Sequence, residues 1–139
     1  MNYIVEKKLS ANDLGITGSH QAGILIPKKS DLLEFFPLLD ASQDNPRQTL
    51  LFLDDLDKTW KFTYIYYNNK LRGGTRNEYR LTGMTAFFRQ YDVKAGDFLI
   101  FEKNGEDFFI RTSNAAEELN KEDGMISLVL GNKWKIIKY

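Results

Sequence analysis

The 139-residue sequence contains no cysteine and a single histidine. Without cysteine, no disulfide framework, thiolate metal site or cysteine nucleophile can form, and one histidine is too few for a metal cluster built on histidine. No apolar run approaches the ~20 residues that span a bilayer, and the N-terminus lacks the basic and apolar regions of a signal peptide. We therefore expect one soluble domain, residues 1–139, in the cytoplasm, without membrane contact, metal or other cofactor.

The sequence also lacks any net charge, because 19 basic residues balance 19 acidic ones. A neutral total argues mildly against a protein that binds nucleic acid. The distribution is uneven, however. Acidic residues gather at 54–57 and 117–123, and between these clusters four cations face one acid, Glu78. These cations are Lys70, Arg72, Arg76 and Arg80. A neutral total can therefore include a basic edge.

Most apolar stretches are short, rich in β-branched and aromatic residues, and interrupted by glycine, asparagine or aspartate, which is typical of strands. The candidates are residues 3–9, 23–26, 49–53, 60–68, 77–81, 97–103, 107–112, 125–130 and 133–138. Asn104-Gly105 predicts a tight hairpin turn with positive φ angles, and residues 130–133 predict another. Residues 117–124 are polar and indicate a surface loop.

Two segments have helical features. Residues 30–36 begin at a capping residue, Ser30, and stop at Pro37. Residues 83–91 place apolar side chains at roughly helical spacing. Many strands with two short helices predict a mainly β (α+β) domain of antiparallel barrel or sandwich type.

Residues 10–21 form a polar segment between two predicted strands, and residues 7–23 contain three glycines. Serine, threonine, asparagine and glutamine side chains suit phosphates and base edges, and the only histidine, His20, lies here between Ser19 and Gln21. No Gly-Lys-Ser/Thr follows, which excludes a phosphate-binding Walker loop. A turn-rich connector is the competing interpretation.

Residues 69–80 contain Gly73-Gly74, which permits a sharp turn or a close approach of the backbone to a ligand. If the chain after these glycines is extended, Arg76, Glu78 and Arg80 alternate onto one face. Arginine can bond guanine O6 and N7 together, and glutamate can accept from cytosine N4. The competing interpretation is a solvent-facing hairpin in which Glu78 offsets its neighbours.

Catalytic interpretations are weakly supported. A triad with His20 lacks a nucleophile elbow. The acidic-x-Lys tripeptides Glu6-Lys7-Lys8 and Asp92-Val93-Lys94 have no clear acidic partner, and three aspartates at 54, 55 and 57 are typical of a solvated turn. We expect no catalytic residue, although a compact metal-dependent nuclease and a protein-interaction barrel stay as alternatives.

At the two polar segments the sequence resembles the N-terminal effector-binding domain of EcoRII-type restriction endonucleases. The resemblance rests on residues 8–23 (KLSANDLGITGSHQAG) with Ile26-Pro27, and on residues 65–68 (IYYN) followed by 75–80 (TRNEYR). Residues 94–98 (KAGDF) resemble the strand entry of plant B3 transcription-factor domains, which share the DNA-binding pseudobarrel fold.

The resemblance implies an open, B3-like pseudobarrel of about seven strands with two projections that grip the major groove. The N-arm would be residues 10–21 with the following strand, and the C-arm residues 69–80. Family contact positions fall on Lys7, His20, Arg76, Glu78 and Arg80. We add neighbouring polar residues as DNA-binding candidates: Ser19, Gln21, Lys70, Arg72, Thr75 and Asn77.

The resemblance also implies a parent protein. EcoRII-type enzymes carry a catalytic nuclease domain on the same polypeptide, so the chain is expected to be a monomeric, non-catalytic fragment of a larger type II (type IIE) restriction endonuclease. Its partner would be double-stranded DNA with a short GC-rich site such as CC(A/T)GG. Where this sequence has Gly74 and Tyr79, the enzyme that gives the family its name has lysines, so the resemblance implies that phosphate anchoring here is left to Lys70 and Arg72.

Overall fold

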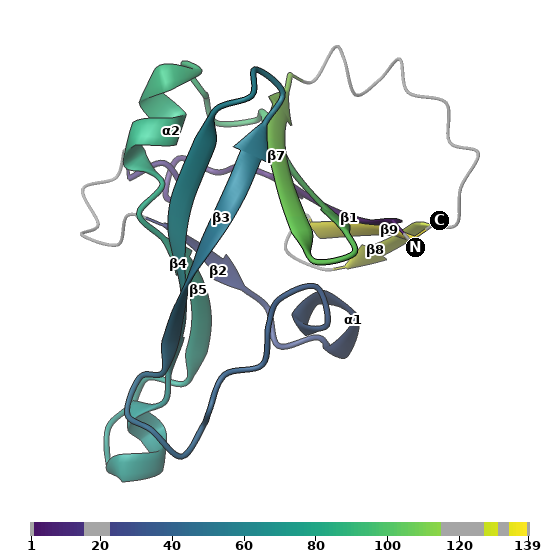
Figure 1. Cartoon of the computed structure of the whole chain (residues 1–139). Coiled ribbons are helices and arrows are strands. Elements are labelled where there is room, and N and C mark those ends of the chain that lie inside the picture. Colours follow the sequence, from purple (N-terminus) through teal and green to yellow (C-terminus); the bar gives the residue numbers. More distant parts are fainter. Residues whose placement is uncertain (1, 16–22, 115–126, 131–133, 139) are drawn as a thin grey trace.

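The computed structural model describes residues 2–15, 23–114, 127–130 and 134–138. Nine strands form one sheet in the order β2-β5-β4-β3-β7-β6-β1-β9-β8 (Figure 1). The strands are β1 (Asn2–Lys8), β2 (Gly23–Ile26), β3 (Arg47–Asp54), β4 (Thr59–Tyr67), β5 (Glu78–Thr82), β6 (Phe98–Asn104), β7 (Asp107–Ser113), β8 (Ser127–Leu130) and β9 (Trp134–Lys138). All pairings are antiparallel except β3 with β7.

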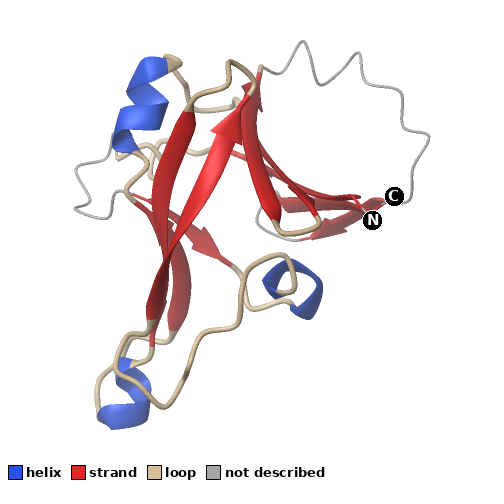
Figure 2. Ribbon diagram, in the orientation of Figure 1, coloured by secondary structure: helices blue, strands red, loops and turns tan. Residues whose placement is uncertain are grey.

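The sheet curls around an aromatic core. Over the first half of β4 the side chains alternate, with Trp60, Phe62 and Tyr64 buried and Thr59 and Lys61 exposed. This pattern places every second side chain inside, as expected for a strand with one wet face. The parallel contact between β3 and β7 is short, joining only Phe52–Asp54 to Phe108–Ile110, and the two strands diverge beyond it (Figure 2). The barrel is therefore open on that side.

Three short helices accompany the sheet: α1 (Ser30–Leu33), the 3-10 helix η1 (Asn69–Arg72) and α2 (Thr85–Gln90). The prediction for 30–36 was too long. Lys29, not Ser30, occupies the N-cap position, and no side chain caps the helix. Beyond Leu33 the chain continues to Phe36 in tighter turns, with Phe35 N–H donating to the Leu32 carbonyl (3.2 Å) and Phe36 N–H to the Leu33 carbonyl (3.1 Å). No signal predicted η1.

Two further expectations need correction. The sheet has nine strands where the resemblance implied about seven, because β8 and β9 continue it beyond β1.

In the β6–β7 hairpin Asn104 pairs with Asp107, so Gly105-Glu106 forms the two-residue loop. Among the described non-glycine residues, positive φ is limited to Asn45, Asp57 and Asp92. Gly105 alone has positive φ in this loop, which makes it a type II′ turn instead of an Asn-Gly type I′ turn.

Some expectations fall outside the described residues. These are the surface loop at 117–124, most of the turn at 130–133, and the end of the N-arm with Ser19, His20 and Gln21. Within the described part of the chain, no helix has the length and apolar character needed to cross a membrane.

Candidate functional site

The two arms join the sheet on neighbouring strands. The N-arm leads into β2 at Gly23, and the C-arm leads into β5 at Glu78. Because β2 and β5 are antiparallel, with Gly23 opposite Thr82 and Ile26 opposite Tyr79, the arms enter at opposite ends of one ribbon. Gly23 is required there, since a Cβ would lie 2.3 Å from the Leu81 carbonyl oxygen. This close approach fixes where β2 begins, after the N-arm.

The predicted row of charged side chains is formed. The Arg76 guanidinium donates to Glu78 Oε1 from Nε (3.0 Å) and from one terminal nitrogen (2.8 Å), and Arg80 Nε lies 3.4 Å from the same oxygen. Arg76 also lies over the Tyr67 ring, with its Cζ 3.6 Å from the ring centroid. The expectation that these residues share one face is confirmed. Their role toward DNA stays a prediction.

The electrostatics keep Glu78 ionised. Burial alone would raise the pKa of its carboxyl, but the adjacent guanidinium groups of Arg76 and Arg80 outweigh burial and lower the pKa. The row therefore presents two cations around one anion at neutral pH. The Arg80 Nε is buried and forms an ion pair with Glu78 without a well-aligned hydrogen bond.

The same face extends across four strands. Arg80 on β5 is opposite Leu25 on β2 and Ile65 on β4, and Ile65 is opposite Arg47 on β3. Arg47 is exposed, and alternation places its side chain on the side of the sheet that carries Arg80. Sequence reasoning missed Arg47, because only strand register connects it to residues 33 positions later.

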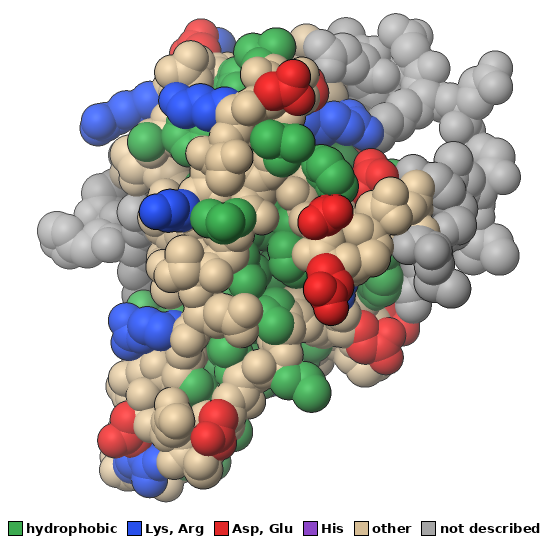
Figure 3. Space-filling view, viewed as in Figure 1, with side chains coloured by type: hydrophobic (Ala, Val, Ile, Leu, Met, Phe, Trp, Pro, Cys, Tyr) green, Lys and Arg blue, Asp and Glu red, His purple; other side chains and the backbone are tan. Residues whose placement is uncertain are grey.

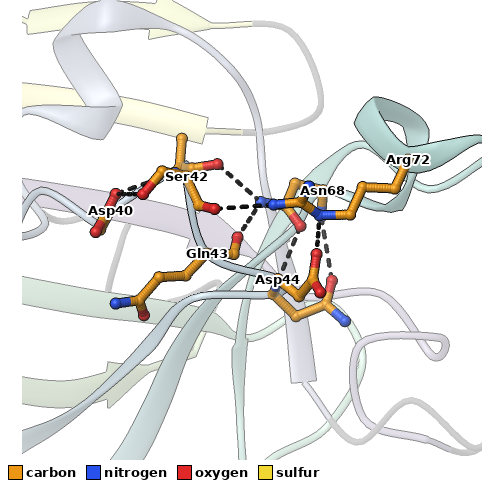
Figure 4. Close-up of polar contacts among 8 residues, drawn as sticks. Asp40, Ser42, Gln43, Asp44, Asn68 and Arg72 are labelled. Atoms are coloured by element: carbon orange, nitrogen blue, oxygen red, sulfur yellow. Dashed lines mark hydrogen bonds and ion pairs between the residues drawn. The ribbon is translucent and has the colours of Figure 1, made fainter.

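The root of the C-arm is clamped to residues 40–46 (Figure 4). Asn68 is 1% exposed and donates through Nδ2 to the carbonyls of Gln43 (2.6 Å) and Ala41 (3.3 Å). Its Oδ1 accepts from Asn45 N–H (2.9 Å), and Asn45 Oδ1 accepts from Asn68 N–H (3.2 Å). The polar segment before β3 thus holds the start of the C-arm, which the sequence did not indicate.

The C-arm folds back on itself through η1. Gly73 ends the helix at φ 89°, and the Lys70 N–H bonds the Arg76 carbonyl (2.9 Å). A Cβ on Gly74 would lie 2.8 Å from Asn69 Cβ, so this compact arm cannot accept a larger residue there without shifting. The lysine that EcoRII has at this position is therefore incompatible with the arm as it stands.

The remaining C-arm candidates differ in exposure and partners. Lys70 and Thr75 are exposed, and within the described residues neither side chain has a hydrogen bond or ion pair. Arg72 forms an ion pair with Asp44 and donates to the Ser42 carbonyl (2.8 Å). Asn77 is also already engaged, as an acceptor, by neighbouring side chains. Lys70 is thus the cation with the fewest competing partners.

Lys28 is a second residue that the sequence reasoning missed. Its ammonium bonds Asn77 Oδ1 and lies 5.4 Å from the centroid of the Tyr66 ring, while the Tyr66 hydroxyl donates to the same Asn77 oxygen (2.6 Å). Tyr79 stacks on Tyr66, with ring centroids 4.3 Å apart, and faces the opposite side from Glu78. Because the Tyr79 side chain lies on the other face of β5, the lack of a lysine at this position removes no charge from the Arg76–Glu78–Arg80 row.

Lys7 lies in a different setting from the one predicted. It is 8% exposed, and its Nζ lies 2.7 Å from both carboxylate oxygens of Asp13. Asp13 Oδ2 in turn accepts from Ser10 N–H (2.9 Å), and Ser10 Oγ accepts from Asp13 N–H (3.2 Å). Lys7 thus anchors the base of the N-arm, and a direct contact with DNA requires this ion pair to open.

The three aspartates at 54, 55 and 57 form a structured turn. Asp54 accepts from Trp60 Nε1 (2.8 Å), from the Tyr91 hydroxyl, and from the backbone N–H groups of Leu56 (2.8 Å) and Lys58 (2.9 Å). Burial would raise the pKa of Asp54, but these hydrogen bonds outweigh burial and lower the pKa to about 2. The hydrogen bond to Asp54 is also the main cause that raises the pKa of Tyr91 to about 12.

The acidic-x-Lys tripeptides do not converge on a metal site. Glu6 is buried in β1, and Lys94 forms an exposed ion pair with Asp92 (3.1 Å). The described residues contain no group of three or more histidine, cysteine or carboxylate side chains placed to share a metal ion. The nuclease alternative therefore gains no support from these residues.

Comparison with known proteins identifies relatives of two kinds. A family model described as restriction endonuclease EcoRII, N-terminal, matches residues 1–105. The type II restriction enzyme EcoRII of Escherichia coli is 41% identical over 87 residues, which cover 58% of this chain and 21% of that protein. Auxin response factor 12 of Arabidopsis thaliana is 36% identical over 95 residues, covering 68% and 14%.

Solved structures show the same fold. The Arabidopsis FUS3–DNA complex aligns with a TM-score of 0.61 at 20% identity, covering 79% of this chain and 95% of that one. The LEC2–DNA complex from Arabidopsis thaliana gives 0.61 at 21% identity, covering 83% and 96%. The expected B3-like half-barrel is therefore confirmed. The chain spans only 21% of the length of EcoRII and 14% of that of auxin response factor 12.

Proposed function

The chain belongs to the family described as restriction endonuclease EcoRII, N-terminal, and from this premise we propose that it binds a short double-stranded DNA sequence through the N-arm and C-arm. The observation that carries the proposal is the Arg76–Glu78–Arg80 row. This row lies on the ribbon that connects the two arms. The FUS3 and LEC2 structures, which share this fold, are complexes with DNA, and this supports the proposal.

The dimensions of the ribbon suit a DNA groove. From Glu78 to Thr82 the four steps of β5 span ~14 Å at about 3.4 Å per residue. The major groove of B-DNA is about 12 Å wide. An arm at each end of such a ribbon can contact the two phosphate backbones while the ribbon faces the base edges. Lys70 and Arg47, both exposed, would contact phosphates.

The row would read bases by exchanging partners. In the free protein Glu78 holds Arg76 with two hydrogen bonds, which keeps the guanidinium extended over Tyr67. On a G·C pair, an arginine can turn its paired donors to guanine O6 and N7, and the carboxylate can accept from cytosine N4. A carboxylate is repelled by phosphates, so its place in the row favours base reading over general attraction.

We further propose that the domain works in a larger type II restriction endonuclease. In that setting this chain supplies DNA recognition, as an effector-binding or targeting unit, and a nuclease domain elsewhere on the polypeptide supplies cleavage. A short GC-rich site such as CC(A/T)GG fits two arginines and one glutamate. Ser19, His20 and Gln21 would complete the contacts from the N-arm. A cytoplasmic, monomeric domain is part of the same proposal.

Fluorescence anisotropy with a panel of short duplexes, including CC(A/T)GG, tests the proposal. The wild-type chain should select one sequence over the others. Glu78→Gln should weaken binding to that sequence by about 10- to 100-fold, which corresponds to a loss of about 1–3 kcal/mol. Because the substitution removes a negative charge, binding to unrelated duplexes should not weaken.

Glu34→Gln serves as the matched control, because Glu34 is an exposed carboxylate near α1, away from the β2–β5 ribbon. This control should leave both affinities unchanged. Equal losses on selected and unrelated duplexes with Glu78→Gln would remove Glu78 from the reading role. Failure of the wild-type chain to bind any duplex would refute DNA binding itself.

A further inference from the structure

One edge of β3 is only partly used. Residues Arg47 to Leu53 pair with β4 on one side, but β7 pairs on the other side only with Phe52, Leu53 and Asp54. Residues 47–51 therefore present a strand edge that no described strand covers. An edge of this kind has free backbone donors and acceptors, and it can accept an added strand.

A groove of about 590 Å³ runs along this edge, between β3 and the tip of the β6–β7 hairpin. Its apolar lining includes Leu51, which is 55% exposed, together with Phe108 and Phe109. Phe108 packs against the buried rings of Phe35 and Phe52, with ring centroids 5.6 and 5.1 Å away. Figure 3 shows apolar side chains along this hollow, with acidic side chains on its hairpin side.

The charges of the groove point to the kind of partner. Glu106 and Asp107, at the hairpin turn, line it and are exposed, and no lysine or arginine is among its described lining residues. The adjacent cations are Arg47, at the start of the strand edge, and Lys103, whose Nζ lies 5.6 Å from the Phe108 ring centroid. A carboxylate-bordered groove repels phosphates and attracts basic side chains, so a nucleic acid is a poor occupant.

We propose that this groove binds an extended polypeptide segment with alternating apolar and basic side chains, which adds to β3 as a strand along residues 47–51. Alternation places one set of side chains on the inner face, toward Leu50 and Phe108, and the other on the outer face, where Leu51 and Asp107 lie. The five edge residues would pair with ~17 Å of extended chain. The proposal does not depend on DNA binding.

The test uses the ¹⁵N-labelled chain and an end-blocked eight-residue peptide that alternates valine and lysine. Backbone amide shifts should concentrate at residues 47–51 and 105–109, and a peptide alternating valine and glutamate should cause none. Leu51→Ser should raise the dissociation constant about tenfold, whereas Leu38→Ser, at a 98% exposed position outside the groove, should not change it. Both positions are exposed enough that folding should persist.

Charge variants give an independent readout. Glu106→Gln with Asp107→Asn should weaken the lysine peptide several-fold, and Lys103→Gln should tighten it. The proposal is overturned if the wild-type chain does not bind the lysine peptide, or if both peptides bind equally. The proposal is also overturned if the amide shifts concentrate at residues 76–82, or if an equimolar DNA duplex displaces the peptide. Either result would place the peptide on the Arg76–Glu78–Arg80 row.

Discussion

Replacing Asn68 by alanine removes the clamp at the root of the C-arm, and the cost follows from its contacts. Its buried side chain makes three hydrogen bonds to residues 41–45, two at 2.6 and 2.9 Å and a longer one at 3.3 Å. At about 1 kcal/mol for each neutral hydrogen bond, the loss is about 2–3 kcal/mol. Ala41 and Gln43 are exposed residues, so water can replace the lost donor at their carbonyls, which reduces the expected loss in free energy of unfolding to about 2 kcal/mol.

Urea unfolding, followed by the fluorescence of the buried Trp60 and Trp134, measures this change. Gln90→Ala is the control, because this amide is exposed at the end of α2 and should shift the free energy of unfolding by less than about 0.5 kcal/mol. At temperatures where Asn68→Ala stays folded, its affinity for duplexes should also fall, since the C-arm loses its anchor. A stability loss below about 0.5 kcal/mol with an unchanged denaturant slope would refute the clamp.

Three further predictions follow from the site and the fold. Arg47→Ala should weaken binding to every duplex, and it should reduce the slope of log K against log salt concentration by about 1 between 50 and 200 mM salt. Arg89→Ala on α2 should change neither the affinity nor the slope. Equal slopes for both variants would contradict a phosphate contact at Arg47. The pKa of Asp54 is lowered from 3.8 to about 2 in the folded chain, so its contribution is complete above pH 3.8 and is lost as the pH falls through 2. The wild type should lose about 2 kcal/mol more than Asp54→Asn over that range in urea titrations, and parallel curves would contradict this. Gly74→Lys restores a charge that EcoRII has, but the side chain would collide with Asn69; it should lower both the melting temperature and duplex affinity, and a gain in affinity at unchanged melting temperature would refute the collision.

The sequence predicted those features that depend on local pattern. The β-branched and aromatic composition of residues 60–68 located β4, and period-2 alternation placed Arg76, Glu78 and Arg80 on one face. Gly73 ends η1 with positive φ, which agrees with a sharp turn at the predicted glycine pair. These features can be predicted from the sequence because the strand period and the conformations of glycine depend on only a few neighbouring residues.

Features that depend on distant contacts were not predictable in this way. Lys7 is a lysine on a strand, which usually indicates a solvated side chain, and only the return of the chain at Asp13 buries and neutralises it. Arg47 joins the charged face through the register of three neighbouring strands. The clamp at Asn68 depends on residues 40–46, which have no periodic pattern to signal a structural role.

The paired hydrogen bonds between Asn45 and Asn68 have a consequence for protein engineering. They fix the chain immediately before the C-arm, and pairing of β5 with β4 fixes it immediately after. Residues 69–77 are thus held at both ends, and the side chains of Arg72 and Asn77 add contacts to Asp44 and to Tyr66. We therefore expect that a C-arm from another family member can be grafted as a cassette between Asn68 and Glu78 without redesign of the barrel, provided that the arginine at 72 and the asparagine at 77 are kept.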